Sequence, residues 1–477
     1  MEQSKTPLYD QLMLHQKRTP ISLHVPGHKN GTLLSEQKYK YFQDLLKLDV
    51  TELTDLDDLH SPEGVILESE KLLTAFYGVE KSYFLVNGST VGNLAMILAT
   101  LKEDDIVFVQ RNSHKSVLNG IELAGAKAVF LDPEFNEEWG VTGGLSPQIL
   151  RRAFELYPEV RAIILTYPNY YGMVNNLKEM ITLAHEKRIP VLVDEAHGAH
   201  FITGGSFPKS SIQLGADIVV QSAHKTLPAM TMGSFLHINS SFISRESVER
   251  YLHILQSSSP SYPIMASLDI ARSYAATYSD EDHEYLHKQI QTFKNELQRL
   301  DMIKVLNYAG EGDLLKITIQ SASLLSGFQM QALFEEKGIF TEMADPNNVL
   351  LVMPLLKKNR AFPFQQLIKG ITQSLKNVSK QSRNLVRHDY KPGISTLVIN
   401  HKEFKHWSKK KVSLKESVGE IAAEKIIPYP PGIPLLLPGE RITPSIAEQI
   451  ESLIDLGAKF QGNMEIGQHM ISILEKG

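Results

Sequence analysis

The sequence predicts an α/β fold: a mostly parallel central sheet with helices on both faces, followed by a smaller C-terminal α+β domain. Two observations predict the sheet. Between residues 82 and 220, six short apolar runs alternate with stretches of helical periodicity, and each run is apolar on both alternating positions. Strands covered on both faces have this pattern. Strands that alternate with helices in this way form parallel sheets.

The predicted strands are SYFLV (82–86), DIVFV (105–109), KAVFL (127–131), RAIIL (161–165), PVLVD (190–194) and ADIVV (216–220). Further along, a long polar helix at about 280–300 leads to the strand-like segments VLNYA and LLKITI, a helix near 326–337 and the run NVLLVM (348–353). We therefore expect an N-terminal segment (1–60), a large domain (61–300) that holds the ligand site, and a small α+β domain (301–477).

The amino-acid composition excludes several classes of function. The 477 residues are 42% hydrophobic and 22% charged, as in ordinary globular proteins, and they include no cysteine. Disulfides, Cys-ligated zinc, iron–sulfur clusters and cysteine nucleophiles are therefore excluded. The formal charge of −5 gives no reason to expect nucleic-acid or membrane binding. Because no apolar run approaches the roughly 20 residues of a membrane helix, we expect a soluble, cytoplasmic protein.

One stretch, 357–411, departs from this balance, with fourteen Lys or Arg against Asp389 and Glu403. A solvated charged surface is the favoured interpretation. The alternative is a patch that binds a polyanion, but no aromatic residues or groove-reading motif accompany the charges.

Polar residues gather where the predicted strands end. In open parallel sheets, ligands bind beyond the carboxyl ends of the strands. Five strand ends deliver hydroxyls, imidazoles, an acid and a lysine to that edge. They are Asn87-Gly88-Ser89-Thr90, Arg111-Asn112-Ser113-His114-Lys115, the Thr166–Tyr171 segment, Asp194-Glu195-Ala196-His197 and Ser222-Ala223-His224-Lys225.

The first of these ends suits an anion. Gly88 lets the backbone approach closely, and the helix that follows presents free N–H groups and the positive end of its dipole. Ser89 and Thr90 add hydroxyl donors. The alternative is a plain strand–turn–helix junction with a capping hydroxyl.

The run Asp194-Glu195-Ala196-His197 resembles the end of an NTPase strand. That reading needs a phosphate loop with a Gly-Lys pair, which occurs nowhere in the chain. A metal site of Asp194, His197 and His200 lacks an evident fourth ligand, so we predict no metal. The remaining role for Asp194 is a buried carboxylate that keeps a partner's ring nitrogen protonated.

Lys225 follows a strand directly, where burial would make its amine a usable nucleophile; the alternative is a surface lysine. An anion site, a carboxylate for a pyridinium and an amine for a Schiff base together fit pyridoxal 5′-phosphate. His114 could stack on the face of the cofactor ring; the alternative is a histidine that caps a helix.

The chain also resembles a known family, the Orn/Lys/Arg decarboxylases, which are pyridoxal-phosphate enzymes of the aspartate-aminotransferase fold (fold type I). Its length is similar to that of the short form of the family, which lacks the extra N-terminal receiver-like domain. The matching stretches are HVPGHKNG (24–31), TELTDLDDLHSPEG (51–64), FLVNGST (84–90), RNSHKS (111–116), VDEAHGAH (193–200), QSAHKT (221–226), SSSPSY (257–262) and YPPGIPLLLPGE (429–440).

The resemblance implies site residues. Lys225 would form the Schiff base, Asp194 would pair with the pyridine nitrogen, and His197 would lie beside the ring. Glu342, in the strand-like run GIFTE, would lie near the distal cation of the substrate. His114 would stack on the ring. The phosphate would be held by Ser89, Thr90, Ser222 and His224. The segment Ser257–Ser259 would reach into a neighbouring subunit, which implies a homodimer.

The implied activity is decarboxylation of a basic L-amino acid (arginine, lysine or ornithine) to an amine that feeds polyamine metabolism. The residues do not choose among the three substrates. Two alternatives remain open: another fold type I enzyme, such as an aminotransferase, and a non-catalytic binding protein that uses the basic stretch.

Overall fold

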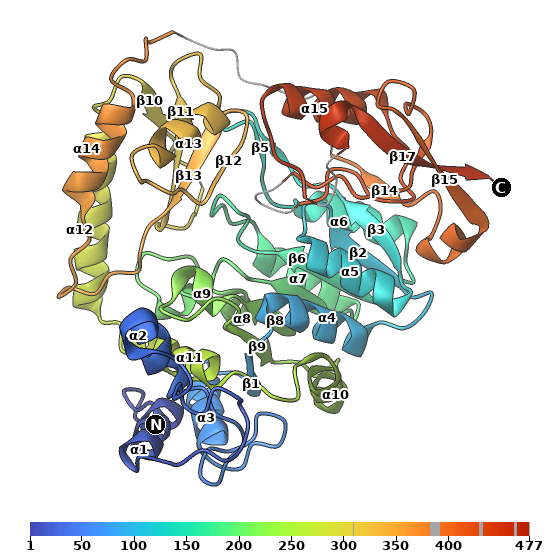
Figure 1. Cartoon of the computed structure of the whole chain (residues 1–477). Helices are drawn as coiled ribbons and strands as arrows, with labels where there is room; N and C mark the ends of the chain where they lie inside the picture. Colours follow the sequence, from blue (N-terminus) through green and yellow to red (C-terminus); the bar gives the residue numbers. More distant parts are fainter. Residues whose placement is uncertain (309, 382–391, 429–432, 462–464, 477) are drawn as a thin grey trace. The chain divides into compact units, whose positions relative to one another are not determined.

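The structure is a computed structural model that describes residues 1–308, 310–381, 392–428, 433–461 and 465–476 (Figure 1). Part of the basic stretch (382–391), the last residue of VLNYA and the start of YPPGIPLLLPGE lie outside the described residues. The chain divides into two compact units, Met1–Thr100 with Pro190–Ser279 and Leu101–Ile189 with Asp280–Gly477. The predicted domain boundaries at 60 and 300 stay predictions.

The fold class is confirmed. The first unit contributes strands in the order β1 (Lys81–Leu85), β9 (Ser234–Ile238), β8 (Ile218–Gln221) and β7 (Val191–Asp194). The second contributes β6 (Ala162–Thr166), β2 (Ile106–Gln110), β3 (Lys127–Leu131) and β14 (Ile394–Thr396). These are the eight strands of the largest sheet. In the pairings described, β9 and β14 run antiparallel to their neighbours, whereas β7 with β8, and β2 with β3 and β6, are parallel.

All six strands predicted from the apolar runs form, each within two residues of the predicted bounds. The helices of the first unit are α1 (Pro7–Lys17), α2 (Glu36–Leu46), α3 (Val65–Tyr77), α4 (Gly88–Thr100), α8 (Ser211–Leu214), α9 (Ala223–Thr226), α10 (Arg245–Leu255) and α11 (Tyr262–Ala276), with the short 3-10 turn η1 (Phe201–Thr203).

Helix α4 packs on all four strands of the first unit. Gly92 makes this close packing possible, because a Cβ there would lie 2.7 Å from Leu85 Cδ1 and 2.8 Å from Val220 Cγ1. Any larger side chain would push α4 away from the sheet. The glycine therefore fixes where the first turn of α4 lies relative to the ends of β1 and β8.

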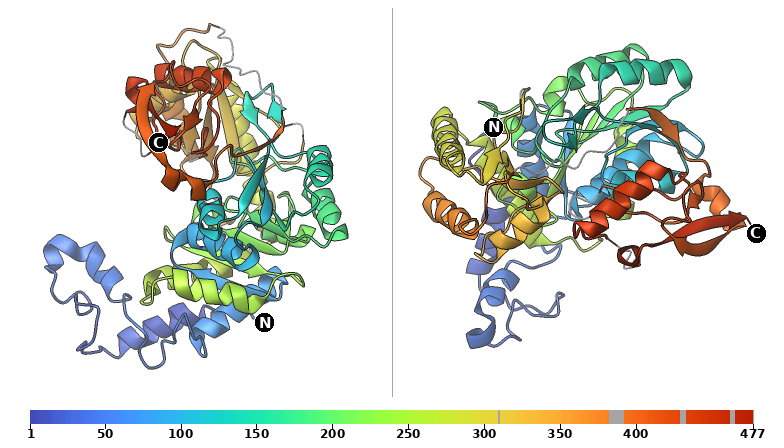
Figure 2. Two further views of the ribbon diagram at one scale, coloured as in Figure 1. Left: turned by 90° about the vertical axis from the view of Figure 1, so that its right-hand side faces the viewer. Right: turned by 90° about the horizontal axis from the view of Figure 1, so that it is seen from above.

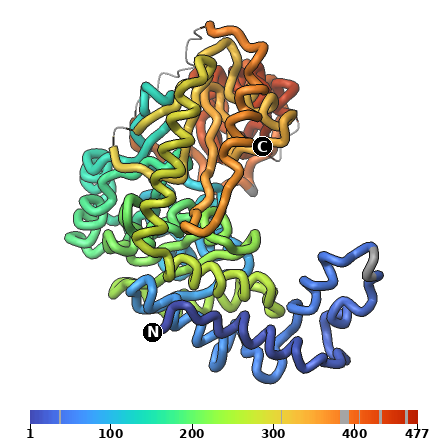
Figure 3. The backbone as a smooth tube through the Cα atoms, turned by 90° about the vertical axis from the view of Figure 1, so that its left-hand side faces the viewer, coloured from blue at the N-terminus to red at the C-terminus, as the bar shows by residue number. Residues whose placement is uncertain are grey.

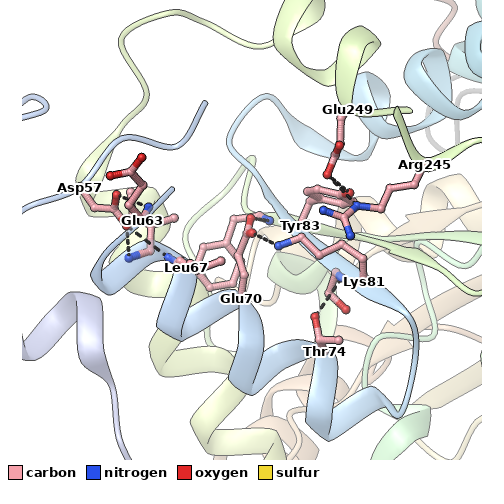
Figure 4. A network of polar contacts seen from close by, with 12 residues as sticks. Asp57, Glu63, Leu67, Glu70, Thr74, Lys81, Tyr83, Arg245 and Glu249 are labelled. Carbon is pink, nitrogen blue, oxygen red and sulfur yellow. Dashed lines mark hydrogen bonds and ion pairs between the residues drawn. The ribbon is translucent and has the colours of Figure 1, made fainter. Parts of the chain in front are cut away.

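A polar network joins α3, β1 and α10 in the same unit (Figure 4). The Lys81 ammonium lies 2.7 Å from the carboxylate of Glu70, and the Tyr83 hydroxyl donates to Glu249 at 2.7 Å. Burial raises the pKa of Glu70, and the charge of Lys81 opposes that rise. The carboxylate of Asp57, from the matched stretch 51–64, accepts backbone N–H groups at the start of α3. The network anchors the strand that leads to Gly88.

The second unit carries, besides its four strands of the large sheet, a four-stranded antiparallel sheet. The strand order is β10 (Ile303–Val305), β11 (Lys316–Ser321), β13 (Asn348–Val352) and β12 (Met343–Ala344). A three-stranded antiparallel sheet has the order β15 (Trp407–Ser413), β17 (Met470–Lys476) and β16 (Ile421–Ala422). The short strands β4 (Phe135–Asn136) and β5 (Val141–Thr142) form a hairpin. These sheets confirm a smaller C-terminal part that mixes helices and strands.

The helices of the second unit are α5 (Lys115–Ala124), α6 (Pro147–Leu156), α7 (Leu177–Glu186), α12 (Asp280–Leu297), α13 (Gly327–Glu335), α14 (Phe364–Ser374) and α15 (Pro444–Asp455), with 3-10 turns η2 (His401–His406) and η3 (Ile466–Gln468). Helices α12 and α13 match the predicted long polar helix and the helix near 326–337.

Two local predictions are wrong. Of the strand-like segment VLNYA, only Val305 lies in a strand, the last residue of β10, and 306–308 are not in a strand. The run GIFTE (338–342) is not a strand, because pairing with β13 begins only at Met343, which faces Leu350. Gly338 has a left-handed φ of +72° and turns the chain after α13. Glu342 therefore lies on the loop that enters β12.

Ion pairs occupy much of the described part of the basic stretch. Lys358 pairs with Glu281, Lys380 with Asp301, Lys402 with Glu103, Lys410 with Glu475 and Lys411 with Glu465. A lysine that already faces a carboxylate is a poor phosphate ligand. The pairs therefore favour a solvated charged surface. Among the helices described, none combines the length and the apolar character that a bilayer crossing requires.

Candidate active site

Asp194 is the last residue of β7, and its side chain is buried, with 3% of the residue exposed. One carboxylate oxygen, Oδ2, accepts a hydrogen bond from Asn93 Nδ2 of α4 at 2.9 Å. The other, Oδ1, accepts from the backbone N–H of Ala196 at 3.1 Å. A carboxylate held by two donors has a fixed orientation, so it can present its charge to a ligand without rearranging.

Lys225 lies in the single helical turn α9, which begins directly after β8. Its Nζ is 3.0 Å from Nε2 of His197, which is itself 3% exposed. Strands β7 and β8 are parallel, with Asp194 opposite Val220. Asp194 and the segment from Ser222 to Lys225 therefore leave the sheet at the same edge, as the strand-end argument predicted.

The first turn of α4 forms a cradle of hydroxyls. Gly88 has a φ of +76°, a conformation that favours glycine. The hydroxyl of Ser222 donates to that of Ser89 at 2.8 Å, so that the end of β8 contacts the start of α4. Thr90 follows on the exposed side of the same turn. Hydroxyls beside the N-terminus of a 13-residue helix are the donors that a phosphate group needs.

His224 is half-buried, and its Nδ1 lies 2.9 Å from the carbonyl oxygen of Gly233. That contact puts the proton on Nδ1, since a carbonyl can only accept. Its Nε2 is then the acceptor nitrogen of the neutral ring. Protonation of the imidazole would be needed before Nε2 could donate to an anion.

The second unit holds the other two predicted site residues. His114 is the N-cap of α5, with Nδ1 accepting from the backbone N–H of Ser116 at 3.2 Å. This is the capping arrangement that was considered as the alternative to ring stacking. Because the cap uses one ring nitrogen and not the ring face, it leaves stacking open. Nearby, Ser113 Oγ and Thr166 Oγ1 are 3.2 Å apart and join the ends of β2 and β6.

Glu342 is exposed and lines an open cavity of about 560 Å³ with Phe340, Thr341 and Phe362. Within the first unit, hydrogen bonds bring together Lys225 with His197, and Ser222 with Ser89. Glu342 and His114 belong to the second unit.

Sequence reasoning missed two residues at this edge. Asn93, fully buried, holds Asp194, and Glu195, also fully buried, binds the ends of β7 and β8. A signal for Asn93 exists: it is a polar residue on a face of α4 that is otherwise formed by Val91, Gly92, Ala95 and Met96. Such a residue needs a buried partner, but the sequence does not say which one.

A model of the Orn/Lys/Arg decarboxylase major domain matches residues 6–317, and a model of the C-terminal domain of the same family matches residues 380–466. The chain belongs to the Orn/Lys/Arg decarboxylase family.

Among curated relatives, the Bacillus subtilis protein YaaO, described as uncharacterised, is 45% identical over 98% of both chains. The arginine decarboxylase of Bacillus subtilis is 31% identical and covers 100% of this chain and 99% of its own. The constitutive lysine decarboxylase of Escherichia coli is 23% identical over 97% of this chain and 78% of its own.

Solved structures agree on the fold. The Escherichia coli constitutive lysine decarboxylase superposes with a TM-score of 0.81 at 20% identity, covering 99% of this chain and 82% of that one. A serine palmitoyltransferase variant with pyridoxal phosphate superposes with a TM-score of 0.52 at 18% identity over 65% of this chain and 76% of its own. The protein is thus a pyridoxal-phosphate-dependent decarboxylase of fold type I. The first unit fits this cofactor: a fixed buried carboxylate, a lysine at the same sheet edge and a hydroxyl cradle at a helix N-terminus.

The contact between Asn93 and Asp194 gives a prediction that does not depend on activity. Asn93→Leu removes the donor to Oδ2 of a buried carboxylate. We expect the free energy of unfolding of the cofactor-free protein to fall by about 1–3 kcal/mol, measured by urea denaturation at pH 7.

A second substitution at the same position sharpens the test. Asn93→Asp places two carboxyl groups side by side, and repulsion raises the pKa of the pair. Stability should then be greater at pH 5, where the pair holds a proton, and should fall as the pH rises to 8. Equal stability of wild type and Asn93→Leu, or no pH dependence specific to Asn93→Asp, would contradict the contact.

Proposed function

We propose that this enzyme decarboxylates a basic L-amino acid to the corresponding amine and CO₂, that it acts in the cytoplasm, and that its product enters polyamine metabolism. The observation that carries the proposal is the contact of Lys225 Nζ with His197 Nε2 at 3.0 Å, at the sheet edge where the buried Asp194 is held. An amine nucleophile and a fixed anion at one edge are the two groups that this chemistry requires of the protein.

When bound, pyridoxal phosphate supplies an aldehyde that joins to amines and a ring that accepts the electron pair left behind by the departing carboxylate. We assign Lys225 Nζ to hold that aldehyde before substrate arrives. Asp194 would keep a proton on the ring nitrogen through its carboxylate. Because Asn93 and Ala196 already orient both carboxylate oxygens, the anion does not have to reorganise as charge develops on its partner.

The remaining cofactor residues bind and orient. Ser89 and Thr90 would donate their hydroxyl hydrogens to the phosphate, and Ser222 would hold it indirectly, through the Ser89 hydroxyl to which it donates. The N-terminus of α4 would add backbone N–H groups and its dipole. We also assign His224 to the phosphate. His114 would cover one face of the ring, a role compatible with its capping contact through Nδ1.

Proton movement falls to His197 and Lys225. Their nitrogen atoms are within hydrogen-bond distance, so a proton can pass between Nε2 of the histidine and Nζ of the lysine. After loss of CO₂, the substrate's α-carbon needs a proton, and this pair is placed to return one. His197 is 3% exposed, so water has little direct access to its ring.

Which basic amino acid is the substrate is a separate question. Four relatives that are 29–31% identical over at least 92% of this chain are named arginine decarboxylases, whereas the lysine decarboxylases are 23% identical. We therefore infer arginine as the first substrate to test, ahead of lysine and ornithine. Glu342 is assigned to the distal cation, since a carboxylate can accept two parallel hydrogen bonds from a guanidinium group.

A substrate panel tests the activity. Purified enzyme with added cofactor is given L-arginine, L-lysine, L-ornithine and L-glutamate, and CO₂, amine and 2-oxo acid are quantified. We expect CO₂ and amine in equal amounts, with kcat/KM for arginine at least about tenfold above the others. Accumulation of 2-oxo acid would identify an aminotransferase instead, and no turnover of any basic amino acid would overturn the proposal.

The assigned roles predict different defects. Asp194→Asn should retain cofactor yet lose kcat by about 10²-fold or more, because the ring nitrogen loses its anion. His197→Phe should lower kcat by about 10²-fold with KM unchanged, because proton return and not binding is affected. A near-normal kcat in Asp194→Asn would refute the role of Asp194 at the ring nitrogen. A change in KM alone in His197→Phe would refute the role of His197 in proton transfer.

We also propose a homodimer. The segment from Thr19 to Asp49, which includes α2, extends away from α1 and α3 (blue in Figures 2 and 3). It exposes Ile21, Leu23 and Tyr41 at 90%, 91% and 91%. Apolar groups so exposed on one segment mark an interface. The exposed Ser257–Ser259 segment donates from Ser257 N to Asn87 Oδ1 at 3.2 Å, next to the phosphate cradle, where a partner subunit would meet the site.

Sedimentation tests the dimer. Wild type should sediment as a dimer at micromolar concentration, and the double variant Leu23→Asp with Tyr41→Asp as a monomer with an unchanged circular dichroism spectrum. Leu123→Asp changes another exposed apolar residue, 63% exposed on α5, and serves as the control that keeps the dimer. A monomeric wild type, or a dimer that survives the double change, would refute this interface.

A further inference from the structure

We propose that Glu195 is a positioning residue for catalysis: its buried carboxylate ties the carboxyl ends of β7 and β8 together, and so sets the places of Asp194 and Lys225. This inference rests on the proposed function, which makes those two residues the reactive pair. Glu195 itself follows Asp194 in sequence and is fully buried.

The contacts of Glu195 join three elements. Oε1 accepts from the backbone N–H of Ser211 in α8 at 2.9 Å. Oε2 accepts from Ser210 Oγ and from Gln221 Nε2, each at 2.8 Å. Gln221 is the last residue of β8, directly before Ser222 and four residues before Lys225. The carboxylate thus connects the residue after Asp194 to the strand end that carries the lysine.

The connection extends across the whole strand set of the first unit. Gln221 Oε1 is 3.3 Å from His237 Nε2 in β9, and His237 Nδ1 is 2.8 Å from Ser82 Oγ in β1. Burial lowers the pKa of His237 to about 3, so the ring is neutral and carries one proton. That proton is on Nε2, because Gln221 Oε1 can only accept.

The chain of hydrogen bonds therefore has one direction. Ser82 donates to His237, His237 donates to the Gln221 oxygen, and the Gln221 amide donates to Glu195. Glu195 is the terminal acceptor, and three donors converge on its two oxygens. An amide in its place would put N–H groups against donors, and relief would require Gln221 to flip its amide and His237 to move its proton from Nε2 to Nδ1. The arrangement thus requires a carboxyl group and not merely a side chain of that size.

Burial also disfavours the charged form of the Glu195 carboxyl group. It raises the pKa of Glu195 to about 7, while the hydrogen bonds from Gln221, Ser210 and Ser211 oppose the rise. The groups facing this carboxyl are those three donors and the ring of Tyr77, whose own pKa is raised by burial and by the nearness of Glu195. No lysine or arginine is among these neighbours. Hydrogen bonds, and not an ion pair, therefore hold this buried carboxyl group in place.

The chain supplies a matched control. Asp217 is also buried, with 2% exposed, and binds the opposite ends of the same strands. Its Oδ2 accepts from the N–H of Val191, the first residue of β7, at 2.8 Å, and its Oδ1 accepts from Ser240 Oγ at 2.6 Å. Asp217→Asn therefore makes the same chemical change as Glu195→Gln, on the same pair of strands, away from Asp194 and Lys225.

The experiment compares the two holoenzymes. Thermal unfolding, kcat and KM, and the pH midpoint of the cofactor's absorbance are measured for Glu195→Gln and Asp217→Asn. Both should unfold at lower temperature. Only Glu195→Gln should shift the midpoint, by at least about half a pH unit, and lower kcat about tenfold, because small displacements of reactive groups are costly. Equal midpoints and equal kcat in the two variants would reduce Glu195 to a purely structural residue and overturn the proposal.

If Glu195→Gln does not fold, Gln221→Met is measured in its place. This change keeps the carboxylate and its contacts with Ser210 and Ser211, and removes only the link to β8. The same midpoint shift is expected, and its absence would refute the proposal. The absorbance titration needs no substrate, so a wild type that decarboxylates nothing would defeat the proposed function while the comparison of midpoints still decides the role of Glu195.

Discussion

The structure depends on one geometric constraint: two neighbouring parallel strands end at the same edge, and each places there a residue that we assign to the active site. Strand β7 ends in Asp194, and β8 is followed by the single turn that carries Lys225. Helix α4, which packs on both strands, supplies Asn93 for Asp194 and the N-terminus that we assign to the phosphate. The fold and the site are thus consequences of the same strand arrangement.

Much of this could be read from the sequence because the signals are local. An apolar run five residues long is enough to identify a doubly covered strand, and the residue that follows it is then placed by topology. That step placed Asp194 and Lys225 at one sheet edge, and cofactor chemistry together with the family resemblance gave them their predicted roles. The strand β9 was not predicted as a run of its own. It contains the buried His237, whose ring accepts from Ser82 and donates to Gln221, 155 and 16 residues away, and such distant partners are not visible in a local pattern.

Residues whose role lies in a tertiary contact escaped prediction. Asn93 meets Asp194 across 101 residues, and Glu195 drew attention only as part of a motif that proved irrelevant for lack of a phosphate loop. The run GIFTE has strand-like composition, but pairing with β13 starts only after it, at Met343. For His114 the sequence left two roles, and the observed cap is local enough to have been foreseen from Ser116, two residues on.

The central claim is that Lys225 is the residue that joins the cofactor. The most direct measurement reduces the holoenzyme with borohydride, which makes the lysine–cofactor bond permanent, and then identifies the modified peptide by mass spectrometry. The account predicts one added pyridoxyl phosphate per chain, on Lys225 in the peptide that contains Gln221-Ser222-Ala223-His224. Modification of a different lysine, with Lys225 recovered unmodified, would contradict it.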